Sequence, residues 1–358
     1  MNNPGLGNNV PRDDSPARGS FLETYSQAGS GLKAFHAHGM GTENVLLLEG
    51  TDGRLLEAAA REAFDLLDYL EQVLSKFLPE SDVSLLNALG AAQPVRVGHD
   101  ALRLLTLSRQ AWEISNGAFD PTLGGLIQAW GFVDMEGRIP ADAEIEQLLA
   151  ARGMNHVILD QEAATARFDR QGVSVDLGGI GKGYAVDAMG ALLKERGIAA
   201  GAVISGRSSV LTWGAPPGEE SWEFEAVHPD DRDESVATLE VKQGVVSSSA
   251  ASERRFVVRG TEYGHVLDPR TGRPARTVKG VTVWTESALF GDVLSTMLFV
   301  LGKEALGRQG CARRLAEAWK PGNTASRASI LLFEGDPSVW GGLRVEAFHI
   351  GTPGFKLK

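Results

Sequence analysis

Residues 173–184 read Val173-Ser-Val-Asp-Leu-Gly-Gly-Ile-Gly-Lys-Gly-Tyr184, a strand pattern that passes through glycines into a helix pattern. Such a junction exposes backbone N–H groups at a helix N-terminus, where an anion can bind, and Lys182 adds a positive charge. It is not a Walker motif, because no Ser or Thr follows the lysine, and it is not G-x-G-x-x-G. The stretch is equally compatible with a phosphate site and with a tight turn that carries a solvated lysine.

The sequence on both sides of this stretch alternates between helical and strand patterns. Helices are expected at 54–77, from Asp100 as N-cap to just before Asn116, at 184–196 and at 288–301. Strand patterns occur at 173–176, 202–205, 254–258 and 280–284. This order predicts an α+β protein, a single compact unit of two lobes over residues 31–358, behind a flexible N-terminal arm over residues 1–30.

The amino-acid composition and charge exclude several classes of protein. The 358 residues include 35 basic and 46 acidic side chains, and the net charge of -11 argues against a general nucleic-acid or anionic-membrane binder. No apolar run is long enough for a transmembrane segment, and the single cysteine, Cys311, excludes an intrachain disulfide or a multi-Cys metal site. Residues 1–20 lack the apolar core of a signal peptide, so we expect a cytoplasmic protein, or a periplasmic or membrane-anchored one if a signal peptide was removed.

Two loop segments carry side chains suited to chemistry. Residues 116–122 (NGAFDPT) combine turn signals with an aromatic ring and a carboxylate. Residues 263–274 (YGHVLDPRTGRP) contain His265, which can act as a general base near neutral pH, together with arginines that can bind phosphate. The alternative for the second segment is a surface hairpin held by Asx turns around Asp268.

A third segment, residues 291–296 (GDVLST), stands at the start of an apolar helix pattern. Asp292 and Thr296 are one helical turn apart, so their oxygens lie on the same side, and Mg²⁺ prefers such ligands together with phosphate and water oxygens. The alternative is that Asp292 is the N-cap of this helix and Thr296 is merely packed.

Together, in this order, the segments resemble the FAD:protein FMN transferases, the ApbE family. The matching stretches are SKFLPESDVSLLN (75–87), NGAFDPTLGGLIQAWGF (116–132), VDLGGIGKGYAVD (175–187), YGHVLDPRTGRP (263–274) and DVLSTMLFVLG (292–302). The resemblance implies an ApbE-like fold with a flavin cleft between two lobes. It also implies an enzyme that uses Mg²⁺ to transfer FMN from FAD to a Thr or Ser hydroxyl of an acceptor flavoprotein, with release of AMP.

The resemblance also implies a role for individual residues. His265 matches the position of a catalytic base. Metal ligands are implied at Asp292, Thr296, the carbonyl of Gly179 and, as in some members, Ser295. Flavin or adenosine contacts are implied at Met40, Phe77, Ala118, Phe119, Asp120, Asp176, Lys182 and Leu267, and Arg270 either faces phosphate or stabilises its loop.

The chain departs from the family pattern in three places. Phe77 replaces a usual tyrosine, residues 204–209 (ISGRSS) replace Asn-Ile-Gly-Gly-Glu/Asp, and residues 247–250 (SSSA) replace an Ala/Ser-Thr-Ser-Gly loop. Two alternatives therefore stay open: an FAD-binding protein, and a Mg²⁺-dependent FAD pyrophosphatase that yields FMN and AMP without transfer to protein. Asp52-Gly53 is followed by Arg-Leu-Leu and not by Thr/Ser-Gly-Ala-Thr, so the acceptor is expected to be another protein.

Overall fold

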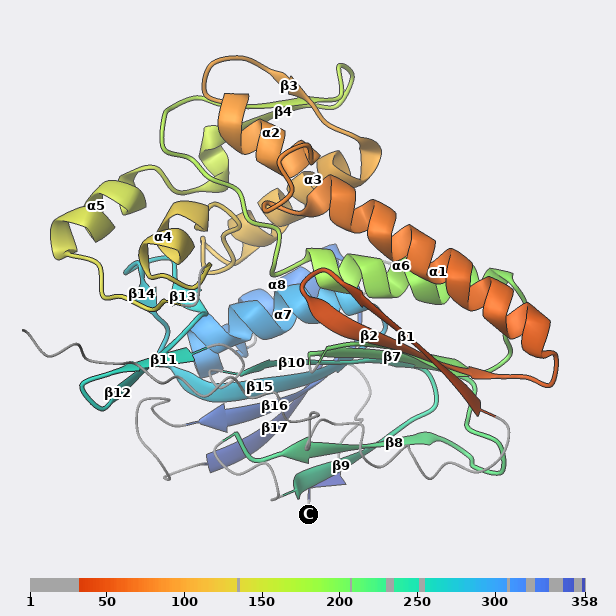
Figure 1. The fold of residues 1–358 in the computed structure, drawn as a ribbon. Helices are drawn as coiled ribbons and strands as arrows, with labels where there is room; N and C mark the ends of the chain where they lie inside the picture. Colours follow the sequence, from red (N-terminus) through yellow and green to blue (C-terminus); the bar gives the residue numbers. More distant parts are fainter. Residues whose placement is uncertain are drawn as a thin grey trace, which may run out of the picture.

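An antiparallel sheet forms the base of the molecule (Figure 1). The computed structural model describes residues 32–133, 136–206, 208–229, 235–250, 255–307, 310–319, 326–334, 344–350 and 356–357. The arm predicted at residues 1–30 lies outside them. Within them the sheet has eight strands in the order β1-β2-β6-β7-β10-β15-β16-β17. These are Leu32–Gly39, Thr42–Glu49, Gly201–Ser205, Ser209–Trp213, Gly244–Ala250, Val278–Thr285, Ala328–Glu334 and Arg344–Ile350.

Both faces of this sheet are covered, which explains its unbroken apolar runs. In β16, Ile330 and Leu332 face the helices, whereas Leu331 and Phe333 belong to a second core on the opposite face. The second core is completed by a small sheet in the order β18-β9-β8, formed by Lys356–Leu357, Ser235–Val241 and Trp222–Val227. A strand buried on both sides shows a run of apolar residues rather than alternation.

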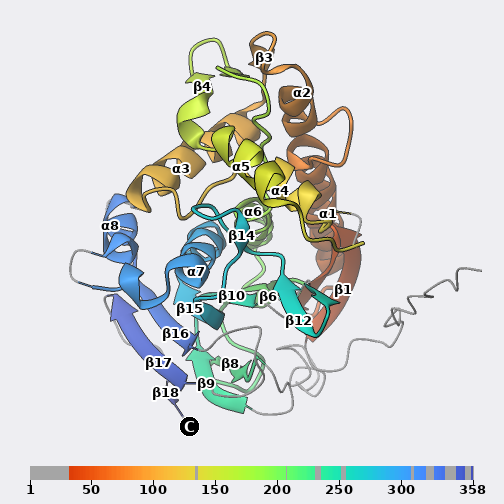
Figure 2. The same ribbon diagram turned by 90° about the vertical axis from the view of Figure 1, so that its left-hand side faces the viewer.

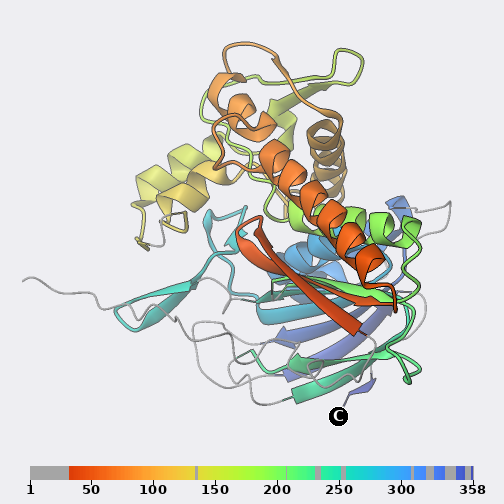
Figure 3. The same cartoon turned by 45° about the vertical axis from the view of Figure 1, so that its right-hand side comes forward.

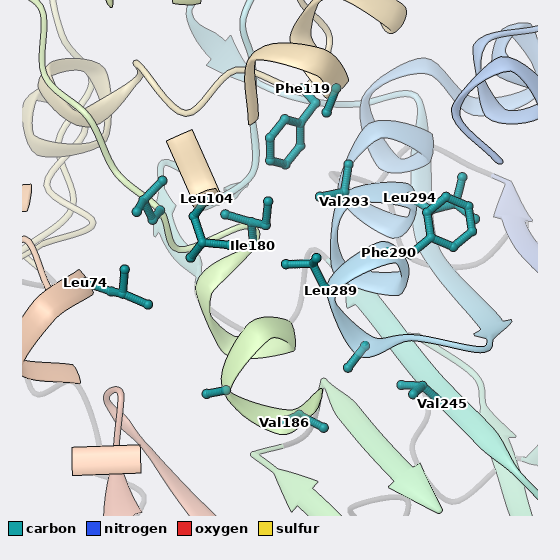
Figure 4. Packing of buried hydrophobic residues seen from close by; sticks show 14 of the residues in the cluster. Leu74, Leu104, Phe119, Ile180, Val186, Val245, Leu289, Phe290, Val293 and Leu294 are labelled. Atoms are coloured by element: carbon teal, nitrogen blue, oxygen red, sulfur yellow. The ribbon is translucent and has the colours of Figure 1, made fainter. Parts of the chain in front are cut away.

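Helices α6 (Gly181–Glu195) and α7 (Ala288–Leu301) lie side by side on the upper face of the sheet, and α1 (Gly53–Leu74) packs against α6 (Figure 1). The two helices approach closely at Gly183, where an added Cβ would lie 2.3 Å from the carbonyl oxygen of Ala288. Figure 4 shows Ile180 and Leu289 filling the space between them. The apolar side chains of α7 therefore form the centre of the main core.

A mostly helical upper lobe is inserted between the neighbouring strands β2 and β6 (Figure 2). After α1 it contains α2 (Asp82–Leu89), α3 (His99–Ile114), α4 (Gly124–Ala129), α5 (Asp142–Ala150) and the 3-10 turn Met154–His156. A short sheet in the order β3-β5-β4 joins Val95–Arg96, Thr165–Phe168 and Val157–Asp160. Helix α6 then returns the chain to the main sheet.

Two hairpins connect the sheet to the upper lobe. The first, β11 (Arg255–Val258) with β12 (Thr261–Gly264), projects from the body of the protein (Figure 3). Its Phe256 and Tyr263 rings stack with centroids 5.3 Å apart, and both rings contact Trp130 of the upper lobe. The second hairpin is β13 (Leu267–Asp268) with β14 (Arg273–Pro274). A 3-10 turn, Gly302–Ala305, and α8 (Cys311–Ala318) follow α7.

The prediction of one compact α+β unit with two lobes is confirmed, and α7 has the predicted bounds. Several helix ends differ from the prediction. Helix α6 begins at Gly181 rather than Tyr184, because the glycine-rich segment itself forms the first turn of the helix. Helix α1 stops at Leu74 rather than Phe77, because Ser75 has extended backbone and its hydroxyl accepts the N–H of Phe77. Helix α3 begins at His99 with Gly98 as N-cap, and the Asp100 carboxylate instead accepts the hydroxyls of Tyr69 and Tyr184.

Two strand assignments also differ from the prediction. Residues 173–176 are extended but join no strand among the described residues; Ser174 forms an isolated parallel bridge with Leu123. Residues 247–250 are the end of strand β10 rather than a loop. None of the helices in the described ranges has the length and apolar character to cross a bilayer.

Candidate active site

The predicted metal ligand Asp292 is buried in the second turn of α7. The N-cap alternative is wrong, because Ser287 caps this helix with its hydroxyl 3.3 Å from the N–H of Phe290. The Asp292 carboxylate accepts the Gly183 N–H at 2.7 Å and the Ser209 hydroxyl at 2.8 Å. Burial raises the pKa of Asp292, and the nearby Lys182 ammonium opposes that rise. The carboxylate therefore joins α7, α6 and β7 at one point.

Gly179 and Thr296, far apart in sequence, are neighbours in space. A Cβ added at Gly179 would lie 3.7 Å from the Thr296 Oγ1 and 3.3 Å from the Phe119 ring. Of residues 288–300, all of them described, Thr296 alone is not buried. Figure 4 shows Phe119 above α7, near Val293. The Thr296 hydroxyl and the Phe119 ring thus both lie beside the Gly179 backbone, on the side of α7 that faces the upper lobe.

The side chains around Asp292 fit a hard cation. Each carboxylate oxygen accepts one of these two hydrogen bonds and keeps a further lone pair for a cation. Ser295 is less free, because its hydroxyl donates to the Asp292 carbonyl and accepts from Ser249. The described residues contain no cluster of three His, Cys, Asp or Glu. A site with one carboxylate and several neutral oxygens suits Mg²⁺, which completes its shell with phosphate and water.

Lys182 lies in the first turn of α6 and faces the turn between β6 and β7. Its ammonium donates to the Ser208 hydroxyl at 2.7 Å, while the adjacent Ser209 binds Asp292. These serines belong to the stretch that replaces Asn-Ile-Gly-Gly-Glu/Asp, a pattern with a single acidic residue, and their contribution was missed in the sequence. Arg207, in the same turn, lies outside the described residues. The turn thus gives the site two hydroxyls in place of a carboxylate.

A charged pair joins the loop after α1 to the glycine-rich segment. The Lys76 ammonium is 2.6 Å from one oxygen of Asp176, and the other oxygen accepts the Gly178 N–H at 2.8 Å. The same ammonium lies 5.1 Å from the centroid of the Phe77 ring, which is 62% exposed. Lys76 was also missed in the sequence, because only the folded chain places it beside Asp176. The pair brings two predicted ligand contacts, Phe77 and Asp176, together.

The loop that carries Ala118 and Phe119 is held by a buried carboxylate. Asp120 accepts the N–H of Thr122 at 2.9 Å and its hydroxyl at 2.5 Å, and Arg152 lies 3.8 Å from its second oxygen. Burial raises the pKa of Asp120, and the bonds from Thr122 oppose that rise. Because the Asp120 side chain is 0% exposed, a ligand at this loop would meet backbone rather than the carboxylate.

The segment after β12 folds as a hairpin around Asp268, the arrangement given above as the alternative to a functional loop. The Arg270 guanidinium binds both oxygens of Asp268, at 2.9 and 2.8 Å, and the Arg270 N–H closes an Asx turn on the same carboxylate. Of the two roles considered for Arg270, stabilisation of the loop is the one that these contacts support. Leu267 is buried in the same apolar cluster as Trp130, so its side chain is not available to a ligand. His265 lies partly buried between β12 and β13.

Met40 occupies the two-residue turn between β1 and β2. Its φ is 52° and that of Gly41 is 71°, the left-handed pair required by a type I′ hairpin. Such a conformation is uncommon for a side chain like Met and costs backbone strain. Met40 packs partly against the main core. The turn therefore places Met40 at the end of the β1–β2 hairpin, partly against the main core.

The family of this chain follows from its similarity to known proteins. A sequence model described as the ApbE family matches residues 40–318. This chain belongs to the ApbE family. A relative from Klebsiella pneumoniae, named FAD:protein FMN transferase, is 30% identical over 275 residues, which cover 76% of this chain and 82% of the relative. A relative of the same name from Escherichia coli is 29% identical, with coverage of 76% and 80%.

Solved structures agree with the ApbE assignment. The ApbE protein of Thermotoga maritima matches with a TM-score of 0.74 and 28% identity, over 88% of this chain and 96% of that one. The flavinyl transferase ApbE of Pseudomonas stutzeri matches with a TM-score of 0.70 and 27% identity, over 88% and 94%. The ApbE fold thus covers nearly the whole of both proteins.

In this ApbE chain the predicted site residues form three contacting groups. Asp292 meets Ser295 and lies near Lys182. Gly179 lies beside both Thr296 and Phe119, and Lys76 bridges Asp176 to Phe77. Asp120 and Arg270 hold their own loops through hydrogen bonds, and Leu267 belongs to the apolar cluster of Trp130. The ligand-binding and catalytic roles of all of these residues, and of His265 and Met40, stay predictions.

Proposed function

We propose that this chain transfers the FMN part of FAD to a Thr or Ser hydroxyl of an acceptor flavoprotein, releases AMP, and needs Mg²⁺ to do so. The observation that carries the proposal is the buried Asp292 carboxylate. It lies beside the Lys182 ammonium, on the helix whose Thr296 meets the backbone of Gly179. The relatives that bear the name FAD:protein FMN transferase support the same reaction.

In the proposed reaction the acceptor oxygen attacks the phosphorus of the FMN half of FAD. The bond from that phosphorus to the oxygen shared with the AMP phosphate breaks, and AMP leaves. Lys182 offsets the negative charge of the phosphates, and His265 takes the proton of the attacking hydroxyl. A bound Mg²⁺ would supply further charge neutralisation at the pyrophosphate.

The chain's own residues would hold the two substrates in line. Asp292 would bring the formal charge that a hard cation requires, with the Gly179 carbonyl and Thr296 hydroxyl as neutral ligands. The ring of Phe77, exposed on one side and near Lys76 on another, offers a stacking surface for a planar ring of FAD. Backbone at Ala118 and Phe119 would border the same ligand.

Incubation of the protein with FAD, Mg²⁺ and an acceptor tests the proposal. The acceptor is a peptide that carries Asp-Gly followed by Thr/Ser-Gly-Ala-Thr, and its matched control has alanine at the accepting hydroxyl. Mass spectrometry should show an FMN adduct on the first peptide and an equal amount of AMP. Free FMN and AMP without an adduct would identify a pyrophosphatase instead. Bound but intact FAD would identify a binding protein.

A further inference from the structure

Asp187 of α6 binds the N-terminus of α7. Its carboxylate accepts the N–H of Ala288 at 2.8 Å, the N–H of Leu289 at 3.0 Å and the hydroxyl of Ser287 at 2.7 Å. The first N–H groups of a helix have no partner within the helix, and a carboxylate there also interacts favourably with the helix dipole. A residue on one helix therefore caps the next helix, 100 positions further along the chain.

Asp292 of α7 does the same for α6. The N-cap of α6 is Ile180, whose apolar side chain cannot accept a hydrogen bond. The N–H of Gly183, in the first turn of α6, instead donates to Asp292 at 2.7 Å. Gly183, early in α6, pairs with Asp292, whereas Asp187, later in α6, pairs with Ala288 at the start of α7. The two helices are therefore antiparallel where they touch. Each helix thus supplies a carboxylate to the N-terminus of the other.

The packing between these contacts leaves little room for either helix to slide. A Cβ at Gly183 would lie 2.3 Å from the carbonyl oxygen of Ala288, so the backbones touch midway between the two capping contacts. Asp292 is held from a third side by Ser209 of β7. A shift of α7 along its axis would break the bonds at Asp187 and at Asp292 together.

From this reciprocal capping we infer that Asp187 is a positioning residue for the proposed cation site. It fixes the start of α7 against α6, so that Asp292 and Thr296, further along the helix, keep their places relative to Gly183 and Gly179. The inference rests on one part of the proposed function, the binding of a cation by Asp292 and Thr296. Asp187 is not itself a ligand in this arrangement; it acts through the position of the helix, and after burial its negative charge also contributes to the raised pKa of Asp292. Asp187→Asn removes that charge and keeps a cap, so it separates the two effects.

Two variants of Asp187 and one matched control test the inference. Asp187→Ala removes every acceptor at the α7 N-terminus, whereas Asp187→Asn keeps one oxygen and is a good capping residue. The control is Asp52→Ala, because Asp52 likewise accepts two backbone N–H groups, at the start of α1. All three are made in the full chain and saturated with FAD.

Binding of Mn²⁺, a paramagnetic probe for a Mg²⁺ site, is titrated by electron paramagnetic resonance. Asp187→Ala should weaken Mn²⁺ binding by about 10- to 100-fold, as loss of a residue that orients a metal ligand does. Asp187→Asn should lose less, and Asp52→Ala should bind as the wild type does even if it melts earlier. Wild-type Mn²⁺ affinity in Asp187→Ala would overturn the inference.

Amide hydrogen exchange of residues 181–184 provides a readout that needs no cation. In Asp187→Ala the Gly183 amide should exchange faster, because its bond to Asp292 depends on the position of α7; in Asp52→Ala it should not change. If the wild type binds no Mn²⁺, the proposed cation site is wrong. The exchange rate of the Gly183 amide still shows whether Asp187 positions Asp292. Unchanged exchange at Gly183 in Asp187→Ala would show that Asp187 does not position Asp292. Should the alanine variant not fold, the same comparison is made with Asp187→Asn.

Discussion

Replacing Asp292 with asparagine removes the formal charge from the proposed cation site and keeps the shape of the side chain. The asparagine oxygen can still accept the Gly183 N–H, which now lies 2.7 Å from the carboxylate. The Ser209 hydroxyl, now a donor at 2.8 Å, can rotate and accept from the amide group. We therefore expect Asp292→Asn to fold with α6, α7 and β7 joined as before.

The effect on stability follows from the burial of this carboxylate. Burial raises its pKa above the ordinary value of 3.8, so the charged form destabilises the folded protein at neutral pH when no cation is bound. A neutral asparagine removes this penalty, and the free energy of unfolding without Mg²⁺ should be unchanged or higher. Asp292→Ala should instead lose about 1–3 kcal/mol, because the buried Gly183 N–H is left without an acceptor.

Asp292→Asn should lower the activity even though it leaves the stability unchanged or higher. A metal ion at a phosphoryl group contributes several kcal/mol to the transition state, so loss of its only charged ligand should lower the rate of FMN transfer on the order of 10²- to 10³-fold. Thr296→Val removes a neutral oxygen and should lower the rate less. Added Mg²⁺ should raise the melting temperature of the wild type in the presence of FAD and leave that of Asp292→Asn unchanged.

The assay measures initial rates of adduct formation against Mg²⁺ concentration, next to melting curves with and without Mg²⁺. Asp52→Asn, a neutralised helix cap at the start of α1, is the matched control and should behave as the wild type in both. Wild-type Mg²⁺ dependence in Asp292→Asn would refute the assignment of Asp292 as a ligand. A large loss of stability in Asp292→Asn would refute the argument from burial.

Three further predictions follow from the geometry around the site. His265→Ala should lower transfer by about 10²- to 10⁴-fold and leave FAD affinity, measured by fluorescence, nearly intact; unchanged turnover would place the base at Asp176 or Asp268. Lys76→Met breaks the 2.6 Å pair with Asp176 and should raise the Kd for FAD about fivefold, or ~1 kcal/mol, and equal affinity would show that the pair does not shape the ligand site. Burial raises the pKa of Asp120, so from the ordinary value of 3.8 up to the folded pKa its carboxyl ionises in the unfolded chain but stays protonated in the folded one, which favours unfolding as pH rises. Denaturant titrations should therefore show a free energy of unfolding that falls over this range, less steeply in Asp120→Asn, and an identical slope would contradict the argument.

Elements whose signals are local could be predicted from the sequence. The bounds of α7 follow from its apolar run and from Ser287, which precedes it as a cap. The predicted end of α1 was wrong because Phe77 continues the apolar spacing, although Ser75 has already left the helix. Residues 173–176 have the composition of a strand, but no strand among the described residues is placed to pair with them.

The site could be predicted only where residues are adjacent in sequence or match a family motif. Asp292 and Thr296 share one helical face, and the structure adds Gly179 to Thr296. The roles of Lys76 and Ser209 depend on partners 100 and 83 positions away, so no local pattern indicates them. The same holds for Asp187, which lies inside the motif that identified the family but acts on the beginning of another helix.

The insertion of the upper lobe between β2 and β6 has a consequence for the newly made chain. Leu46 of β2 pairs with Val203 of β6, so β2 must wait for about 150 further residues to be synthesised, which takes roughly 8–30 s at typical rates of translation. During that time β2 has only the β1 hairpin as a partner, and its apolar residues, including Leu46 and Leu48, lack the core that later buries them. We therefore expect nascent chains that end before residue 200 to bind chaperones that recognise exposed apolar segments, and chains that extend past β7 to be released.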